Sequence, residues 1–395
     1  MVNVFFQPFM VGGAEWYVYN MSRELTKLGH EVHVFTADTC NGTRAPSEEV
    51  IEGISVHRLP LRIDWTYRLK VWSGLEEALT AGSFDVIHTY DYAQPHSKVA
   101  VRAGNRAHVG TALTVFDVHS MIPRKWYKQI PMRAIESYVG RAPLAGADRI
   151  LVRAPELVPP LLELGADERR IIVTPSGIRE GSLGAFDGGA FRKKHGLEGA
   201  SPLILYLGRL NPLKGPQYLL EAAPAILRAF PNACFAFVGP DQSGYGESLR
   251  SQADRLGVGS RARFLGPIYE FEEKMQAYSS CDVFVLPTAF EGTSQAIFEA
   301  MSQAKPLVAT RVGGIPSQVT DGREGFLVEY ADAPALAAKV IEVLGDPAMA
   351  RAMGARGKEK VEAHTYPVLA SEMVKIYERV SAEGREGMKR TEIPA

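Results

Sequence analysis

Two glutamates, Glu291 and Glu299, lie eight residues apart on either side of a predicted helix start. An apolar, strand-like run at 282–286 precedes them, and Thr293 or Ser294 can cap the helix. Glu291 would then stand before the helix and Glu299 inside it. A helix N-terminus binds oxygen-rich ligands, and a carboxylate accepts two hydrogen bonds from a vicinal diol such as a ribose. We interpret the pair as a sugar-nucleotide site, with one carboxylate for each end of the donor.

A solvated helix face is the alternative interpretation of Glu299. The polar residues of this helix fall on one side and the apolar residues on the other: Gln295, Glu299, Ser302 and Gln303 against Ile297, Phe298 and Met301. On that alternative the carboxylate of Glu299 would only face water. The two glutamates alone do not decide between the interpretations, so the elements around them must.

A loop with two basic residues follows the predicted strand 203–207. Arg209 and Lys214 supply a guanidinium fork and a mobile ammonium, which together can neutralise the diphosphate of a leaving group. No Asp-x-Asp sequence near a strand end offers a site for a divalent cation, so we expect neither a metal nor another cofactor. The alternative is a solvated basic pair, but a helix that begins at Pro216 directly after the loop favours a binding role.

A glycine-containing turn opens the first half of the chain in the same way. The predicted strand 2–6 leads through Gly12 and Gly13 into a predicted helix at 14–28. Glycines at this turn let backbone N–H groups and the helix dipole approach a phosphate or a reacting sugar. An ordinary strand-to-helix turn, with Glu15 complementing the dipole, is the equally weighted alternative.

Repetition of strand and helix organises the whole chain. Short runs rich in Val, Ile and Phe alternate with longer helical patterns, which is typical of βαβ units and predicts an α/β fold with parallel sheets. Further strands are predicted at 31–36, 86–89, 109–115, 150–152 and 171–173, and at 234–238, 263–265, 283–286, 306–309 and 326–328.

The length of 395 residues favours two domains. We place the boundary between 1–175 and 176–365, and a hinge in the glycine-rich stretch 175–202. Because open α/β sheets bind ligands at the carboxyl ends of their strands, we expect a site in a cleft between two doubly wound domains.

Composition excludes several classes of protein. Hydrophobic residues make up 46% and charged residues 23% of the chain, the net charge is −1, and no apolar stretch is long enough for a membrane span. The balanced charge argues against nucleic acid as a partner. Cys40, Cys234 and Cys281 are widely spaced, which argues against disulfides and a zinc site and fits a reducing cytoplasm. A strand-like start at residues 2–6 leads us to expect no cleaved secretion signal.

The segment 121–133 mixes basic, aromatic and aliphatic residues. Such a mixture suits peripheral docking on the inner face of the plasma membrane or on a lipid-linked acceptor. An amphipathic core helix with snorkelling Lys and Arg side chains is the alternative that the composition favours.

Several of these motifs together resemble a known family, the retaining glycosyltransferases of family 4 with the GT-B fold. The motifs are Gly12-Gly13-Ala14-Glu15, Leu28-Gly29-His30-Glu31-Val32, Gly208-Arg209 with Lys214-Gly215, the block from Glu291 to Glu299 with Ala300-Met301, and Gly313-Gly314-Ile315-Pro316. The likeness covers nearly the whole chain, and the glutamate block is its most specific part. It implies two Rossmann-like domains facing a central cleft, with the final helix 366–395 packing back on the first domain.

The resemblance implies a metal-independent enzyme that moves a hexose, with retention, from a UDP-, GDP- or ADP-sugar to a hydroxyl acceptor, which could be a glycan, a lipid-linked glycan or a small molecule. It also implies a role for each matched position. Arg209 and Lys214 would hold the diphosphate, with Gly12 and Gly13 across the cleft. The donor sugar would be held by Glu291 and by the backbone of Gly292, Thr293 and Ser294. Glu299 would hold the ribose, and the chain at Pro267 and Ile268 would hold the base. A phosphate oxygen of the leaving group would take the acceptor proton, so no protein base is expected.

Three positions depart from the family pattern: Phe116, and Ser317 and Arg179, which stand where acidic residues are common. Phe116 precedes Asp117 where the family often has a histidine that lines the reacting sugar, and His119 is the nearest histidine that could replace it. Two alternatives remain open, the second of them because of Phe116. One is a sugar-nucleotide epimerase with the same architecture, and the other is a protein that binds a nucleotide sugar without transferring it.

Overall fold

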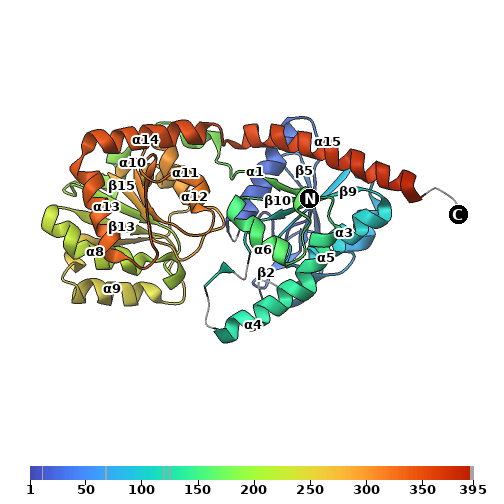
Figure 1. The fold of residues 1–395 in the computed structure, drawn as a ribbon, viewed down its shortest axis with the longest axis horizontal. Helices are drawn as coiled ribbons and strands as arrows, with labels where there is room; N and C mark the ends of the chain where they lie inside the picture. The colour runs from blue at the N-terminus through green and yellow to red at the C-terminus, as the bar shows by residue number, and fades with distance from the viewer. Residues whose placement is uncertain (11, 67–68, 119–120, 124–125, 392–395) are drawn as a thin grey trace. The chain divides into compact units, whose positions relative to one another are not determined.

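The structure is a computed structural model that describes residues 1–10, 12–66, 69–118, 121–123 and 126–391. The chain forms two compact units (Figure 1). The first unit is Met1–Gly177 with Tyr366–Ala395, and the second is Ile178–Thr365. The change from one unit to the other therefore occurs twice along the chain.

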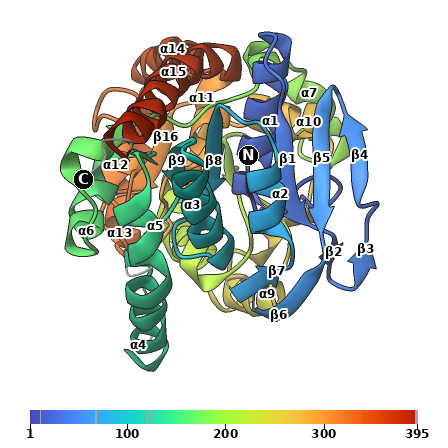
Figure 2. The same ribbon diagram turned by 90° about the vertical axis from the view of Figure 1, so that its right-hand side faces the viewer.

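The first unit contains a parallel sheet with one antiparallel edge strand. Its strands are β1 (His33–Ala37), β4 (Glu48–Ile51), β5 (Ile54–Leu59), β8 (Val86–Tyr90), β9 (Gly110–Val115), β10 (Arg149–Val152) and β11 (Ile171–Val173). They pair in the orders β1-β5-β4 and β11-β10-β9-β8, and β4 is the antiparallel strand. Figure 2 shows β1, β5 and β4 side by side. The central strands β9 and β10 are buried almost throughout, as expected of parallel strands covered on both faces, whereas the edge strand β4 is mostly exposed.

Val2 joins the two groups of strands through parallel bridges to Phe35 and Thr89. The predicted strand at 2–6 is wrong in its extent, since the structure has only this bridge. The reason is that backbone hydrogen bonds beyond Val2 continue only toward β1, where the Ala37 N–H donates to the Val4 carbonyl at 3.2 Å. Toward β8, the last backbone hydrogen bond is the one from the Tyr90 N–H to the Val2 carbonyl.

Two short strand pairs and a helical layer complete the first unit. The strands are β2 (Thr39–Cys40) with β3 (Thr43–Arg44), and β6 (Leu61–Thr66) with β7 (Leu69–Trp72). The helices are α1 (Gly13–Lys27), α2 (Leu75–Ala81), α3 (Pro95–Ala107), α4 (Trp126–Ile135), α5 (Arg141–Gly146), α6 (Val158–Glu163) and α15 (Tyr366–Thr391). Figure 2 shows α4 extending away from the sheet of this unit.

Helix α15 returns to the first unit and packs against α1 and β9. Tyr366, Leu369 and Met373 are buried in one apolar cluster with residues of α1. Gly110 permits the approach to β9, because a Cβ there would lie 2.2 Å from the Val380 carbonyl oxygen. The final helix is thus part of the core of the first unit.

The second unit is built on a six-stranded parallel sheet in the order β14-β13-β12-β15-β16-β17. Its strands are β12 (Leu203–Leu207), β13 (Cys234–Val238), β14 (Ala262–Gly266), β15 (Val283–Leu286), β16 (Leu307–Thr310) and β17 (Gly325–Val328). The order reverses between β12 and β15, the topological switch point at which doubly wound sheets bind ligands. The predicted α/β class is confirmed.

Helices cover both faces of this second sheet, as Figure 1 shows. They are α7 (Gly188–Lys194), α8 (Pro216–Ala229), α9 (Tyr245–Arg255), α10 (Phe271–Ser280), α11 (Gln295–Ser302), α12 (Ile315–Gln318), α13 (Ala333–Gly345) and α14 (Pro347–Glu362). Helix α8 packs against α13 on one side, and α10 and α11 pack together on the other. The strands between them are therefore shielded from water.

The predicted hinge at 175–202 is instead largely part of the second unit. Ile178, Phe191 and Leu197 of this stretch are buried in its apolar core. Asp187 caps helix α7 by accepting hydrogen bonds from the backbone N–H groups of Gly189 and Ala190 at 2.8 and 3.0 Å. Buried apolar side chains and a capped helix give this glycine-rich sequence a fixed place in the core.

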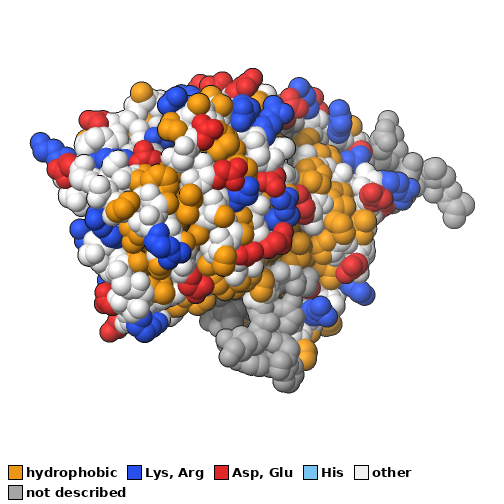
Figure 3. Space-filling model, turned by 60° about the vertical axis from the view of Figure 1, so that its left-hand side comes forward, with side chains coloured by type: hydrophobic (Ala, Val, Ile, Leu, Met, Phe, Trp, Pro, Cys, Tyr) orange, Lys and Arg blue, Asp and Glu red, His pale blue; other side chains and the backbone are white. Residues whose placement is uncertain are grey.

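Charged side chains of both signs are interspersed over the face of the molecule in Figure 3, in keeping with the net charge of −1. Among the described residues, every helix falls short of the length and apolar character needed to cross a membrane.

Candidate active site

Close backbone contacts join three loops at the carboxyl edge of the second sheet. A Cβ on Gly215, which has a φ of 72°, would lie 1.8 Å from the Pro287 carbonyl oxygen, so the loop after β12 touches the loop after β15. A Cβ on Gly313, with a φ of 51°, would lie 1.9 Å from the Glu291 carbonyl oxygen, so the loop after β16 touches the same segment. Only glycine fits such contacts at positive φ. The loops are held in one cluster at the switch point.

Lys214 and Glu291 form an ion pair within this cluster. Their side chains are 18% and 15% exposed, which leaves the pair partly shielded from solvent. The Lys214 backbone N–H donates to the Asn211 side-chain oxygen at 2.9 Å, which fixes the turn that presents the ammonium. The structure therefore brings together two of the three residues predicted to be catalytic, as direct partners.

Arg209 is the third of these residues, and it is exposed at the start of the same loop. The buried Tyr206 hydroxyl donates to the Arg209 carbonyl at 2.9 Å. Burial, and then the negative charge of Glu291, hold the pKa of Tyr206 well above its usual value, so the hydroxyl remains a donor. Among the described residues, the Arg209 side chain forms no ion pair. Its guanidinium is available to an anion beside Lys214.

The backbone after Glu291 is held by a residue that sequence analysis missed. Gln318, which is 2% exposed, accepts the Ser294 N–H at 2.7 Å and donates to the Ser294 carbonyl at 2.9 Å. Ser294 occupies the N-cap position of α11, but its side chain makes no capping hydrogen bond, so the predicted side-chain cap is wrong at this residue. Gly292 is buried and Thr293 half-buried beside it. The Ser294 N–H is already used within the protein.

Glu299 lies inside α11 and is only 6% exposed. Lys274 Nζ lies 2.5 Å from its Oε1, and the Tyr278 hydroxyl donates to its Oε2 at 3.0 Å. The alternative of a solvated Glu299 is therefore wrong, because Lys274 and Tyr278 of α10 cover its carboxylate. Lys274 and Tyr278 belong to no sequence motif that would have identified them as partners of Glu299.

The chain after β14 follows the same carboxyl edge of the sheet. Pro267 is exposed and Ile268 is half-buried, and the neighbouring Tyr269 is 82% exposed. The Gly239 N–H donates to the Gly266 carbonyl at 2.9 Å, which ties this loop to the loop after β13. The backbone of the predicted base-binding segment is accordingly open at the edge of the second unit.

The glycine turn of the first unit is organised by Glu15. The Glu15 carboxylate accepts the Gly12 N–H at 2.8 Å and is 1% exposed, so it closes the N-terminus of α1. A Cβ on Gly13 would meet nothing within 4 Å among the described residues. Steric crowding among the described residues therefore does not require a glycine at position 13.

Phe116, in the place of the family histidine, packs in an aromatic cluster directly after β9. Its ring centroid lies 5.4 Å from that of Tyr17 and 5.9 Å from that of Tyr90. Asp117 is half-buried beside it, and His119 lies outside the described residues. The buried Arg153 guanidinium lies 4.2 Å above the Tyr17 ring, so this edge of the first sheet also carries a cation.

The segment 121–133 is described only in part. Its residues 126–133 lie in α4, and Ile130 is 61% exposed, while positions 124 and 125 lie outside the described residues.

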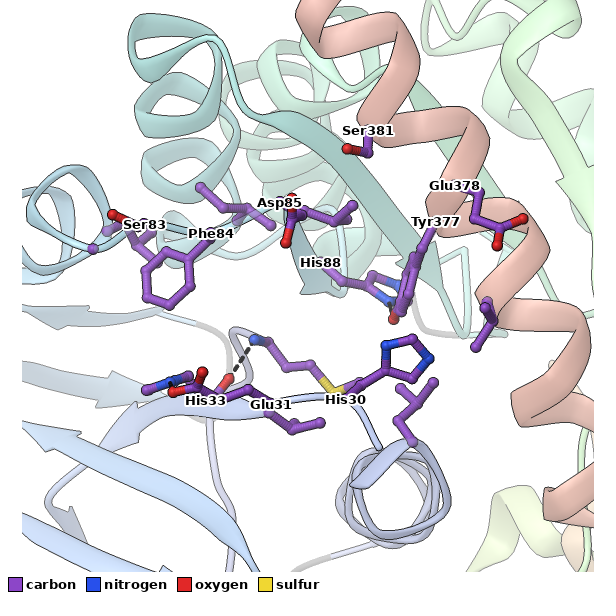
Figure 4. A pocket seen from close by; sticks show the side chains of 18 of the residues that line it. His30, Glu31, His33, Ser83, Phe84, Asp85, His88, Tyr377, Glu378 and Ser381 are labelled. Carbon is purple, nitrogen blue, oxygen red and sulfur yellow. Dashed lines mark hydrogen bonds and ion pairs between the residues drawn. The ribbon is translucent and has the colours of Figure 1, made fainter. Parts of the chain in front are cut away.

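A cavity of about 800 Å³ lies at the opposite, amino-terminal edge of the first sheet. His88 and Tyr377 lie together in this cavity (Figure 4). The His88 Nδ1 atom and the Tyr377 hydroxyl form a hydrogen bond of 2.6 Å. Burial lowers the pKa of His88 well below its usual value, so the ring is neutral. None of the predicted site residues lines this cavity.

Comparisons with known proteins cover both units. Residues 12–177 match the family described as Glycosyl transferase 4-like domain, and residues 188–360 match Glycosyl transferases group 1. The chain belongs to the GT-B glycosyltransferases of the family 4 type. The predicted family, fold and enzyme class are confirmed.

Similar curated proteins include the D-inositol 3-phosphate glycosyltransferase of Streptomyces avermitilis, which is 28% identical over 93% of this chain and 82% of its own. The enzyme of the same name from Nocardia farcinica is 27% identical over 93% of this chain and 84% of its own. Among solved structures, sucrose-phosphate synthase from Thermosynechococcus elongatus has a TM-score of 0.76 at 24% identity, covering 96% of both chains. Anabaena Alr3699/HepE in complex with UDP and glucose has a TM-score of 0.75 at 18% identity, covering 95% of this chain and 97% of its own.

Replacing Gly313 tests whether close loop contact shapes the site. Gly313→Ala should destabilise the second unit by about 1–3 kcal/mol, because the new methyl group meets the Glu291 carbonyl and a positive φ is strained for alanine. Gly199→Ala is the control, since a Cβ there meets nothing within 4 Å, and it should change stability by less than about 0.5 kcal/mol. Urea unfolding measures both, and equal stability of the two variants would contradict the argument.

Proposed function

We propose that this glycosyltransferase moves a hexose from a nucleotide-diphosphate sugar to a hydroxyl acceptor, with retention and without a metal. The observation that carries the proposal is the Lys214–Glu291 ion pair beside the exposed Arg209, at the switch point of the second sheet. A diphosphate is the anion that such a basic pair fits.

The ion pair suggests how the donor is bound. Before the donor arrives, the Lys214 ammonium is neutralised by the Glu291 carboxylate. A diphosphate brings more negative charge to the same place and replaces Glu291 as the partner of Lys214. The released carboxylate then accepts hydrogen bonds from the hydroxyl groups of the donor sugar. Recognition of the phosphate and recognition of the sugar are coupled through one lysine.

Solved relatives support the choice of donor. A structure of Alr3699/HepE from Anabaena holds UDP-glucose, and a structure from E. coli described as trehalose-6-phosphate is bound with UDP-2-fluoro glucose. We therefore take UDP-glucose as the first donor to test, with the base held by the backbone at Pro267 and Ile268. The curated relatives are named for D-inositol 3-phosphate, which makes a small polyhydroxylated molecule the first acceptor to test.

Retention requires attack on the face from which the diphosphate leaves. The bond from the anomeric carbon to the phosphate oxygen breaks, the acceptor oxygen bonds to that carbon, and the acceptor proton passes to the departing phosphate oxygen. In this proposal Glu291 contacts the donor sugar and Glu299 the ribose, so neither takes the acid or base role that the paired carboxylates of a glycosidase have.

Positive side chains take the place of a metal in this proposal. Arg209 and Lys214 carry the charge that offsets the developing negative charge of the leaving group. Within the described ranges, His, Cys, Asp and Glu side chains form no cluster of three or more suited to a metal ion.

A panel of UDP-, GDP- and ADP-sugars tests the proposed donor class. One of them should raise the stability of the protein by about 2.7 kcal/mol at a hundred times its dissociation constant. With a small polyhydroxylated acceptor present, the same donor should be consumed at the same rate with and without a chelator. Thermal unfolding and donor turnover measure these effects. If no member of the panel binds, the proposed function is wrong.

The same assay separates the alternative activities. Turnover that needs no acceptor would indicate an epimerase, and binding without any turnover would indicate a nucleotide-sugar-binding protein.

The two glutamates should differ in effect when each is replaced. Glu291→Ala should lower kcat by about a hundredfold with little loss of nucleotide affinity, because its contacts are to the sugar. Glu299→Ala should weaken nucleotide binding by about tenfold or more, because charge-assisted hydrogen bonds to the ribose are lost. Calorimetry and steady-state kinetics measure both, and parallel losses in the two variants would contradict this division of roles.

A further inference from the structure

One face of helix α10 is directed at the Glu299 carboxylate. Lys274 and Tyr278 are four residues apart on this helix, so their side chains lie on the same face. Lys274 Nζ contacts Oε1 of Glu299 at 2.5 Å, and the Tyr278 hydroxyl donates to Oε2 at 3.0 Å. Each carboxylate oxygen therefore has its own donor from α10.

Burial fixes this arrangement in place. The Glu299 side chain is 8% exposed, the Lys274 side chain is 27% exposed and Tyr278 is fully buried. The Tyr278 ring packs edge-on against Phe284 of β15, with 5.5 Å between centroids, so its hydroxyl cannot swing away without moving the sheet. Burial and the charge of Glu299 hold the pKa of Tyr278 well above its usual value, which keeps the proton on the donor.

The Glu299 carboxylate has acceptor positions left for hydrogen bonds from a ligand. An ionised carboxylate offers about four acceptor positions, two on each oxygen. Lys274 and Tyr278 use one position on each oxygen of Glu299. The remaining capacity is one position per oxygen, which matches the two hydroxyl donors of a ribose diol.

We infer that Lys274 and Tyr278 are positioning residues that orient Glu299 for the ribose and thereby set the preference of this enzyme for ribonucleotides. The inference rests on the proposed function, since it needs a nucleotide donor. Lys274 gives the nearly buried carboxylate a cationic partner, and without one a charge in this environment would be costly. Tyr278 holds the second oxygen, so the carboxylate plane has one orientation.

A purely structural role is the competing explanation. The three side chains also tie α10 to α11, and on that explanation their loss would lower stability without changing how the ribose is recognised. Stability therefore cannot distinguish the two explanations, whereas the comparison of two ligands that differ only in the ribose hydroxyls can.

The test compares a nucleoside diphosphate with its 2′,3′-dideoxy counterpart by calorimetry, using whichever of UDP, GDP and ADP the full chain binds most tightly. The wild type should prefer the ribonucleotide by about tenfold or more, the effect expected of charge-assisted hydrogen bonds. Lys274→Met should weaken binding of the ribonucleotide by about tenfold and leave the dideoxy ligand unaffected, so that the preference falls to about one.

Lys194→Met is the matched control. It removes an ion pair to Glu273, the residue next to Lys274 on α10, with the same change of side chain. This variant should keep the wild-type preference for the ribonucleotide. Tyr278→Phe is the second variant if Lys274→Met does not fold, since it deletes one hydroxyl and keeps the buried ring; it should lower the preference by a smaller factor.

The outcomes separate this inference from the proposed function. If the wild type binds no nucleoside diphosphate, the proposed function fails. If the wild type binds the two ligands equally, or if a folded Lys274→Met or Tyr278→Phe variant keeps the full preference, the proposed function stands and the inference is overturned. Equal losses for both ligands would also overturn it, because they would indicate only a structural role.

Discussion

Backbone crowding at the carboxyl edge of the second sheet is the constraint on which the rest of the site depends. Gly215 and Gly313 bring the loops after β12 and β16 against the segment that carries Glu291. These contacts place a lysine from one loop beside a glutamate from another, although the two residues are 77 positions apart in the chain. The chemistry is therefore a consequence of where parallel strands end and of how tightly their loops can pack.

Charge balance before the ligand arrives is the second constraint on the site. Glu291 is paired with Lys214, and Glu299 with Lys274, so each carboxylate has a cationic partner inside the protein. Buried or half-buried charges without partners would be costly to maintain. In the proposed mechanism the two pairs respond differently to the donor: Lys214 exchanges its partner for a phosphate, whereas Lys274 keeps Glu299 and fixes its direction.

Much of this can be predicted from the sequence, because the strands of the second sheet are short apolar runs. The predicted strands 203–207, 234–238 and 283–286 coincide with β12, β13 and β15. The partners of the glutamates could not be predicted. Lys274 lies in an ordinary amphipathic helix, and its distance of 25 residues from Glu299 leaves no periodic signal. The short antiparallel strands between β1 and α2 were also missed, since they lack the apolar runs of central strands.

A crystal structure of the protein with a bound nucleoside diphosphate tests the central claim most directly. The account predicts that Lys214 Nζ lies within hydrogen-bonding distance of a phosphate oxygen, that Arg209 contacts the same diphosphate, and that the Lys214–Glu291 ion pair is broken. An intact Lys214–Glu291 pair, with the diphosphate bound elsewhere, would contradict it.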